Sequence, residues 1–269
     1  MKNKLITVII LCALLILCAV GYKLIIERTS ATSKFENELV NLAEKNEVPI
    51  FYVQKIMLYS SAGITDNSEN KNLSNIDISQ FTDIAIYLKN ASQDGLTAEN
   101  TINKLWVDEI TLVPNEKWNN TFLTYKNPYD FGKFIQNNSI GDTKIEYKLL
   151  QKNDENSEEL YNQPTFYTDC SNPITLSYTN KNIVTGAKVQ ENTSIATNGK
   201  ILSQAQVDLE ELNYMLSFVI NIENNLGQLF SYKMKLNIYL DAGDNELYNG
   251  YLLQEKDLVG REYGFFRIK

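Results

Sequence analysis

The feature that most constrains this chain is an uninterrupted apolar run close to its N-terminus. Residues Leu5–Val20 contain no charged side chain, and Thr7 is the only polar residue among them. With the residues that follow, up to Ile26, the run is long enough for a helix that crosses the roughly 30 Å hydrocarbon core of a bilayer, which takes about 20 apolar residues. We therefore predict a transmembrane helix over residues 5–26 and expect the lipid bilayer to be one partner of this chain.

The flanks of the run indicate its orientation. Lys2 and Lys4 precede it, and positive charge stays on the cytoplasmic side of a membrane. Residues 1–4 are expected to form a cytoplasmic tip, and everything beyond the helix is expected to be extracytoplasmic in a single-pass protein of the cell membrane. The alternative is a cleaved signal peptide, whose apolar stretch is about 7–15 residues long and ends at a small-x-small site. The nearest such segment is Ser30–Ser33, well beyond the usual place, so we favour an uncleaved anchor.

Residues 27–47 are expected to form a neck between the anchor and a larger domain. Within them, residues 33–46 predict an amphipathic helix, because four apolar side chains recur at helical spacing on one face: Phe35, Leu39, Leu42 and Ala43. This helix either continues the anchor as a stalk or packs along the domain that follows. Packing is slightly favoured, since an isolated helix of this length is marginal in water.

From residue 48 the pattern becomes that of β-strands. Residues 81–88 alternate, and residues 213–223 and 229–240 alternate around the turn Asn224–Gly227, which predicts a hairpin. About a dozen such segments at intervals of roughly 8–15 residues are typical of an all-β sandwich. We predict a mainly β fold over residues 48–269, a β-sandwich of jelly-roll or Ig-like type. A polar stretch at 152–159 leaves open a split into two smaller domains.

The composition excludes several kinds of chemistry. The chain has no histidine, so Ser-His-Asp and Cys-His catalysis and the usual zinc sites are not expected. The lack of histidine also excludes the mechanism of sortase-like transpeptidases, which share the expected topology. Cys12 and Cys18 lie in the apolar run, so Cys170 is the one ectodomain cysteine, and we expect it to be an ordinary thiol. A net charge of −8 argues against nucleic acid as a partner. Lysine outnumbers arginine 22 to 3, a bias typical of AT-rich bacterial genomes.

Two groups of residues are candidates for ligand and metal sites. Trp118, Tyr125 and Tyr129 lie in a turn-rich region beside several asparagines, and their rings could stack on a sugar, as in jelly-roll carbohydrate-binding modules. Clustered oxygen ligands in a loop suit Ca²⁺, which makes a calcium site the hypothesis for a second set of residues. That set is Asp241, Asp244 and Glu246.

Paired carboxylates remain open as a catalytic alternative, because glycoside hydrolysis requires neither histidine nor metal. The pairs that could be named are Asp108 with Glu109, and Asp208 with Glu210 and Glu211.

The hypothesis from the sequence is therefore a membrane-anchored, extracytoplasmic protein that binds an envelope glycan or a surface protein and is not an enzyme. One alternative is a minor-pilin-like assembly subunit, which also combines an apolar helix with a β-sheet domain. The other is a histidine-free carboxylate hydrolase acting on cell-wall glycan.

Overall fold

The computed structural model describes residues 49–69, 75–91, 95–126, 134–139, 144–151, 163–188, 200–241 and 246–268. The expected transmembrane helix and neck lie outside these residues, and so does the polar stretch 152–159. Within the described part of the chain, no helix is both long enough and apolar enough to cross a membrane.

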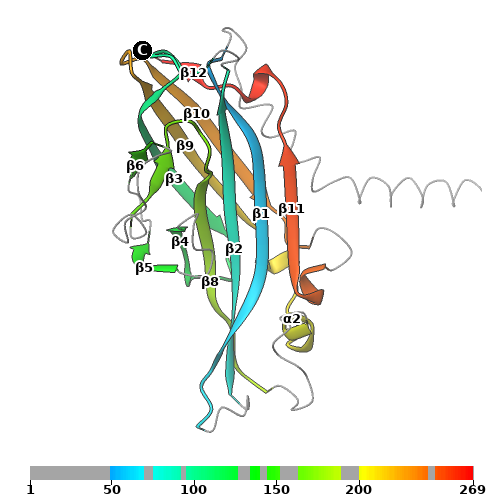
Figure 1. Cartoon of the computed structure of the whole chain (residues 1–269). Coiled ribbons are helices and arrows are strands. Elements are labelled where there is room, and N and C mark those ends of the chain that lie inside the picture. Colours follow the sequence, from blue (N-terminus) through cyan, green and yellow to red (C-terminus); the bar gives the residue numbers. More distant parts are fainter. Residues whose placement is uncertain are drawn as a thin grey trace, which may run out of the picture.

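The described chain is mainly β and forms two open sheets of six strands each (Figure 1). Sheet A has the strand order β11 (Tyr251–Asp257), β1 (Phe51–Asp66), β2 (Ile76–Asn90), β8 (Ile174–Ala187), β4 (Thr121–Lys126) and β5 (Phe134–Ser139). Sheet B has the order β12 (Phe266–Arg267), β10 (Leu229–Ile238), β9 (Tyr214–Asn224), β3 (Ile102–Pro114), β6 (Ile145–Leu150) and β7 (Thr165–Tyr167). Neighbouring strands are antiparallel except β6 and β7, which are parallel.

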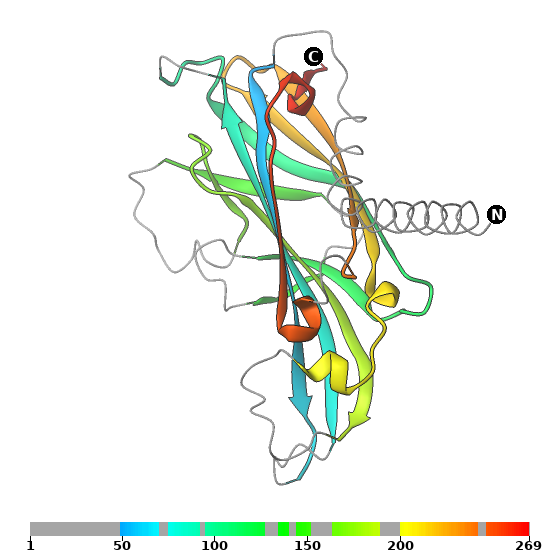
Figure 2. The same cartoon turned by 90° about the vertical axis from the view of Figure 1, so that its right-hand side faces the viewer.

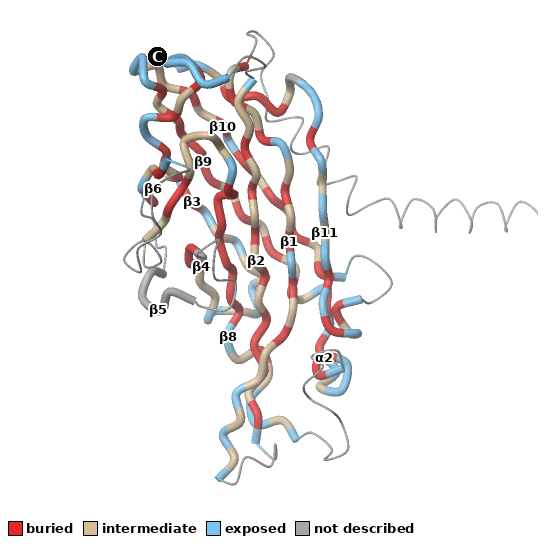
Figure 3. Tube along the Cα trace, in the orientation of Figure 1, coloured by how far each residue is buried: buried red, intermediate tan, exposed pale blue. Residues whose placement is uncertain are grey.

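The two sheets bury one face each against the other. Alternate residues of the long strands are buried, as the alternating colours along β1 and β2 show (Figure 3). Rings from opposite sheets meet in the interior: Phe51 of β1 lies edge-to-face on Phe230 of β10 at 5.3 Å, and Tyr178 of β8 stacks on Tyr214 of β9 at 3.8 Å. The period-2 pattern of each strand therefore supplies one side of a shared hydrophobic core.

Each sheet combines strands from both sides of residues 152–159. In sheet A, β2 pairs with β8 and β1 pairs with β11; in sheet B, β3 pairs with β9. Buried side chains from Phe51 to Phe265 belong to one hydrophobic cluster. Sequence-distant strands are thus joined within each layer, and the C-terminal strands complete sheets that the N-terminal strands begin.

The expected hairpin around Asn224–Gly227 is confirmed, with a turn closed by Gly227 N–H donating to the Asn224 carbonyl at 2.9 Å. The long strand β8 accommodates Asn182 and Gly186 at positive φ. Short 3-10 helices, η4 (Glu246–Asn249) and η5 (Arg261–Tyr263), precede β11 and β12. A further short helix, α2 (Ile201–Gln204), and η3 (Glu210–Leu212) precede β9.

Candidate functional site

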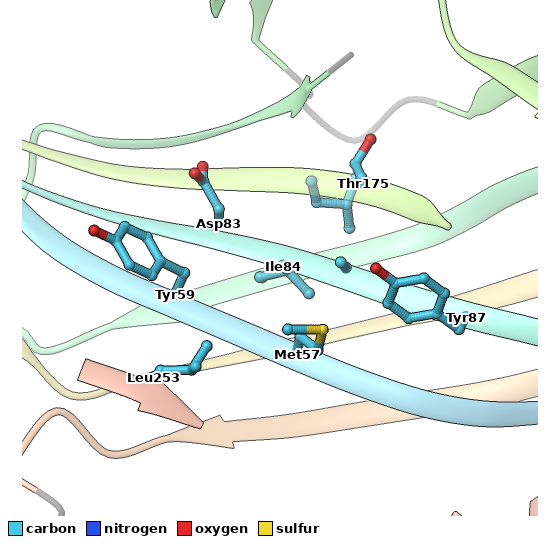
Figure 4. Close-up of a pocket in the computed structure, with 9 residues that line it drawn as sticks. Met57, Tyr59, Asp83, Ile84, Tyr87, Thr175 and Leu253 are labelled. Atoms are coloured by element: carbon cyan, nitrogen blue, oxygen red, sulfur yellow. The ribbon is translucent and has the colours of Figure 1, made fainter. Parts of the chain in front are cut away.

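A hollow of about 350 Å³ lies on the outer face of sheet A, the face turned away from sheet B (Figure 4). We call it the sheet A groove. Its floor and walls come from β1, β2, β8 and β11, and the residues that line it are Met57, Tyr59, Asp83, Ile84, Ala85, Tyr87, Thr175, Leu176 and Leu253.

The register of the strands explains why these side chains gather. Met57 lies opposite Ala85, which in turn lies opposite Thr175, so one row crosses three strands. The next row carries Tyr59 opposite Leu253 on one side and Asp83 on the other. Because alternate residues of a strand share a face, both rows point outward while the intervening residues of β1 enter the core.

Two tyrosine rings mark the ends of the groove. Figure 4 shows Tyr59 and Tyr87 on either side of Met57. Tyr87 lies opposite Lys55, four residues before Tyr59, which corresponds to about 14 Å along the sheet at about 3.4 Å per residue. Tyr59 also stacks on Tyr251 at 5.4 Å with an interplanar angle of 24°, although the two rings remain 41% and 55% exposed. The groove therefore has a flat aromatic platform at one end and a single ring at the other.

Polar groups line one wall of the groove and one of its ends. The Asp83 carboxylate accepts a hydrogen bond from the Ser177 hydroxyl at 2.8 Å, and Figure 4 shows Thr175 farther along the same wall. At the Tyr87 end, Lys55 forms an ion pair with Glu255. This carboxylate raises the pKa of Lys55 above its ordinary value, because it hydrogen-bonds the ammonium. The groove thus combines aromatic and apolar surface with a carboxylate and a hydroxyl at defined positions.

Trp118 and Tyr125, two of the three aromatic residues that the sequence suggested as a ligand site, do not line this groove. Trp118 is half-buried, its Nε1–H donates to the Glu211 carbonyl at 2.6 Å, and the Lys117 ammonium lies 5.1 Å from its ring. Tyr125 is 3% exposed and belongs to the hydrophobic core, so it presents almost no ring surface to solvent. Tyr129 lies outside the described residues.

The suggested calcium ligands are described only in part. Asp241 is exposed and accepts a hydrogen bond from the Asn213 side chain at 2.9 Å, while Glu246 begins η4. Asp244 lies outside the described residues. Among the residues that the structure describes, no three acidic or cysteine side chains are grouped as metal ligands would be.

The carboxylates considered for hydrolysis occupy separate places. Asp108 lies on the outer face of sheet B, where its two oxygens accept hydrogen bonds from Trp106 Nε1 and Asn221 Nδ2, each at 2.9 Å. Glu109 follows at φ +50° in a bulge of β3, exposed to solvent. In the segment before β9, Asp208 accepts from the backbone N–H of Glu210 at 3.0 Å. These interactions fit local turns and sheet surface.

A polar layer inside the core is the other concentration of functional groups. Ser60 and Thr82 hydroxyls are 2.8 Å apart, and Gln80 Nε2 donates to Thr82 at the same distance. The stacked Tyr178 and Tyr214 rings adjoin this layer, and burial raises the pKa of the Tyr214 hydroxyl. Because these groups lie between the sheets, they constrain register and packing and are not displayed to an external ligand.

Cys170 lies in the turn after β7 at φ +62° and packs partly against the core. Burial raises the pKa of its thiol to about 12, with Asp169 adding to the effect. A thiol with such a pKa stays protonated at neutral pH, which is the opposite of an activated nucleophile.

Comparison with known proteins adds no relative: no protein-family model, no curated protein and no solved structure matches this chain. The sheet A groove consequently stands on its own geometry. The sequence contains one signal for this groove. Residues 56–59 are apolar on both faces of the strand, and in an antiparallel sheet one face of such a strand must be covered or offered to a ligand.

Proposed function

We propose that this protein is a non-catalytic glycan-binding module of the cell envelope, held to the membrane by residues 5–26. The ectodomain is a β-sandwich of jelly-roll or Ig-like type, and the sheet A groove is its binding site. The sheet A groove is the observation that carries this proposal: Tyr59 and Tyr87 lie at its two ends on an open sheet face, and the Asp83 carboxylate lies beside Tyr59.

The chemistry of a sugar fits this arrangement. The C–H faces of a pyranose pack on aromatic rings, and its hydroxyls need acceptors and donors at the edges of those rings. Asp83 supplies a hydrogen-bond acceptor, and the tyrosine hydroxyls can donate as well as accept. Met57 and Ala85 form the apolar floor of the groove. The distance of about 14 Å between the ends, from about 3.4 Å per residue, suits a chain of sugars better than a single one.

Charge narrows the class of glycan. The chain carries a net charge of −8, and the groove contains Asp83 with Glu255 at its rim. A polyanionic polymer would be repelled, so the ligand is a neutral or weakly charged polysaccharide chain. Hydrolysis by paired carboxylates would need a second carboxylate several ångströms from the first, and Asp83 is the one carboxylate among the described residues that line the groove.

The binding test uses the full chain in nanodiscs and measures its retention on purified wall glycan and on soluble neutral oligosaccharides. The double variant Tyr59→Ala/Tyr87→Ala is compared with Tyr239→Ala, a half-buried tyrosine just beyond β10 in the other sheet. Retention by the wild type and the control but not by the double variant supports the proposal. Equal retention by all three, or retention of a wall protein that survives removal of the glycan, contradicts it.

The anchor is tested separately by protease treatment of intact cells followed by membrane fractionation. An N-in, single-pass protein remains with the membrane and loses its ectodomain to external protease. An ectodomain that is cut only after lysis would contradict the extracytoplasmic placement without bearing on glycan binding.

A further inference from the structure

Eight large hydrophobic side chains are exposed among the described residues, and they are not scattered evenly. Three belong to the sheet A groove and its rim: Tyr59, Tyr251 and Leu253. Four others lie on loops or chain ends: Leu96, Leu226, Val259 and Ile268, with exposed fractions of 54%, 58%, 81% and 59%. The eighth is Val113, near the C-terminal end of β3.

Backbone hydrogen bonds bring the four loop side chains to the same end of the molecule. The connection that carries Leu96 meets the β9–β10 turn, where Asn225 N–H donates to the Thr101 carbonyl at 3.2 Å. Next to that turn, Ile268 N–H donates to the Leu229 carbonyl at 2.8 Å. On the sheet A side, Leu258 N–H donates to the Gln54 carbonyl at 2.8 Å, which places Val259 beside the start of β1. We call this end the Phe51 pole.

The Phe51 pole is also where the chain arrives from its N-terminal segment. Ile50, the residue before β1, accepts a hydrogen bond from Ala91 N–H at 2.7 Å. The start of β1 and the end of β2 lie at the same end of the molecule as β12 (Figures 1 and 2). Twenty-two residues, 27–48, separate the end of the apolar run from the first described residue. The end of the domain that carries four exposed aliphatic side chains is therefore the end attached to the expected membrane anchor.

The local backbone at the most exposed of these side chains favours its display. Gly260 has φ +144°, a conformation that side-chain-bearing residues avoid, and a Cβ there would meet the Glu262 carboxylate. The turn therefore depends on glycine and leaves Val259 pointing into solvent at the edge of the pole. A buried core gains nothing from this position, because Val259 is 81% exposed.

Charges around the pole are mixed in sign. Lys104 pairs with Glu223 at 2.9 Å, and Lys89 lies 5.4 Å from the ring of Tyr52. Among the described residues the pole carries charges of both signs, so we base its attraction to a bilayer on apolar burial at the boundary between headgroups and acyl chains. Phosphatidylcholine alone should suffice as the lipid.

We propose that the Phe51 pole rests on the bilayer that anchors the chain, with Leu96, Leu226, Val259 and Ile268 in contact with lipid. This contact rests on the proposed membrane tether and adds an orientation to it. With the pole on the lipid, the long strands of sheet A rise from the membrane and hold the sheet A groove away from its surface, where an envelope glycan can reach it.

The test compares two valines at opposite ends of the domain. The full chain, with Cys12, Cys18 and Cys170 changed to Ala, carries a single cysteine at Val259→Cys or Val113→Cys, labelled with an environment-sensitive fluorophore. Leu226→Cys serves as a second reporter on the pole. Each protein is placed in phosphatidylcholine nanodiscs with and without lipids that bear a doxyl quencher near the headgroup.

We expect the Val259 and Leu226 labels to emit at shorter wavelength and to be quenched several-fold more than the Val113 label. Equal, weak quenching at all three positions in protein that remains in the nanodisc would overturn the pole contact and leave the tether standing. If the blue shift at the Val259 label persists in detergent and the lipid quencher has no effect, the pole is covered by another part of the chain, such as residues 33–46, and not by lipid. That result would also overturn the pole contact. Protein that fails to co-purify with nanodiscs would contradict the tether itself.

Discussion

The cluster around Asp108 on the outer face of sheet B and the groove on the outer face of sheet A differ in what their side chains contact. On sheet B the outward polar side chains bond to one another: Trp106 and Asn221 both donate to Asp108, and Asn221 also contacts Ser231. On sheet A the outward residues around the groove are aromatic or apolar, and Tyr59, Tyr251 and Leu253 remain between 41% and 55% exposed.

The contrast is between a cluster whose polar groups hydrogen-bond to one another and a groove whose aromatic and apolar side chains stay exposed. An antiparallel sheet ordinarily presents a polar face to water, as sheet B does around Asp108. Sheet A departs from that rule at the groove, which is lined from β1, β2, β8 and β11. Exposed aromatic surface of this kind is typical of binding sites, which is the physical basis of the proposed function.

The largest effect is expected on sheet B and concerns stability. Asp108→Ala removes the acceptor shared by Trp106 and the buried Asn221. Because each hydrogen bond to a charged acceptor contributes about 1.5–3 kcal/mol, we expect the free energy of unfolding to fall by about 3 kcal/mol. Thermal or urea unfolding measures the loss, with the exposed Glu146→Ala as control. Glycan retention should stay unchanged below the melting transition. A loss of retention by folded protein would show that the outer face of sheet B takes part in binding.

The next effect is on affinity and concerns the aromatic platform. Tyr59→Ala removes the ring that stacks on Tyr251, and anchors of this kind contribute about 2 kcal/mol, which corresponds to about 30-fold in Kd. Titration with a soluble oligosaccharide measures the change. Because Tyr59 is 41% exposed, the melting temperature should change little; a large fall in melting temperature with intact affinity would make the ring structural.

A smaller loss of affinity is expected from the carboxylate in the groove. Asp83→Asn keeps the size of the side chain and its bond from Ser177 but replaces a charged acceptor by a neutral one, which costs about 1 kcal/mol, or about fivefold in Kd. The affinity of wild type and variant, measured at equal salt, checks this. Tighter binding by the variant would indicate an anionic ligand and would contradict the assignment of a neutral glycan.

The smallest effect concerns the ion pair at the rim. The raised pKa of Lys55 means that its contribution to stability is complete below the ordinary lysine value and disappears as pH rises through the folded-state pKa. Glu255→Gln should therefore lower the melting temperature slightly at pH 8, and the difference from wild type should vanish as pH rises beyond 10.5. A difference that persists at high pH would mean that Glu255 acts by packing.

The pattern of residues predicted the fold better than the site. Alternation over 213–223 and 229–240 predicted the hairpin of β9 and β10, because a buried face imposes a period of two. The same alternation does not say which strands become neighbours, so the meeting of β1, β2, β8 and β11 at the groove was not predictable from local pattern. Tyr125 shows the limit: a tyrosine near asparagines looks like a ligand residue, yet the register of β4 turns it into the core.

Hydroxyl-radical footprinting of the full chain in nanodiscs, with and without a neutral wall oligosaccharide, tests the central claim most directly. It reports the exposure of individual aromatic rings, and both sheets carry suitable ones. We predict that the ligand protects Tyr59 and Tyr87 on sheet A and leaves Tyr239 and Trp106 on the sheet B side unchanged. Protection confined to the sheet B side, or no protection of Tyr59 and Tyr87 at saturating oligosaccharide, would contradict the assignment of the sheet A groove as the glycan site.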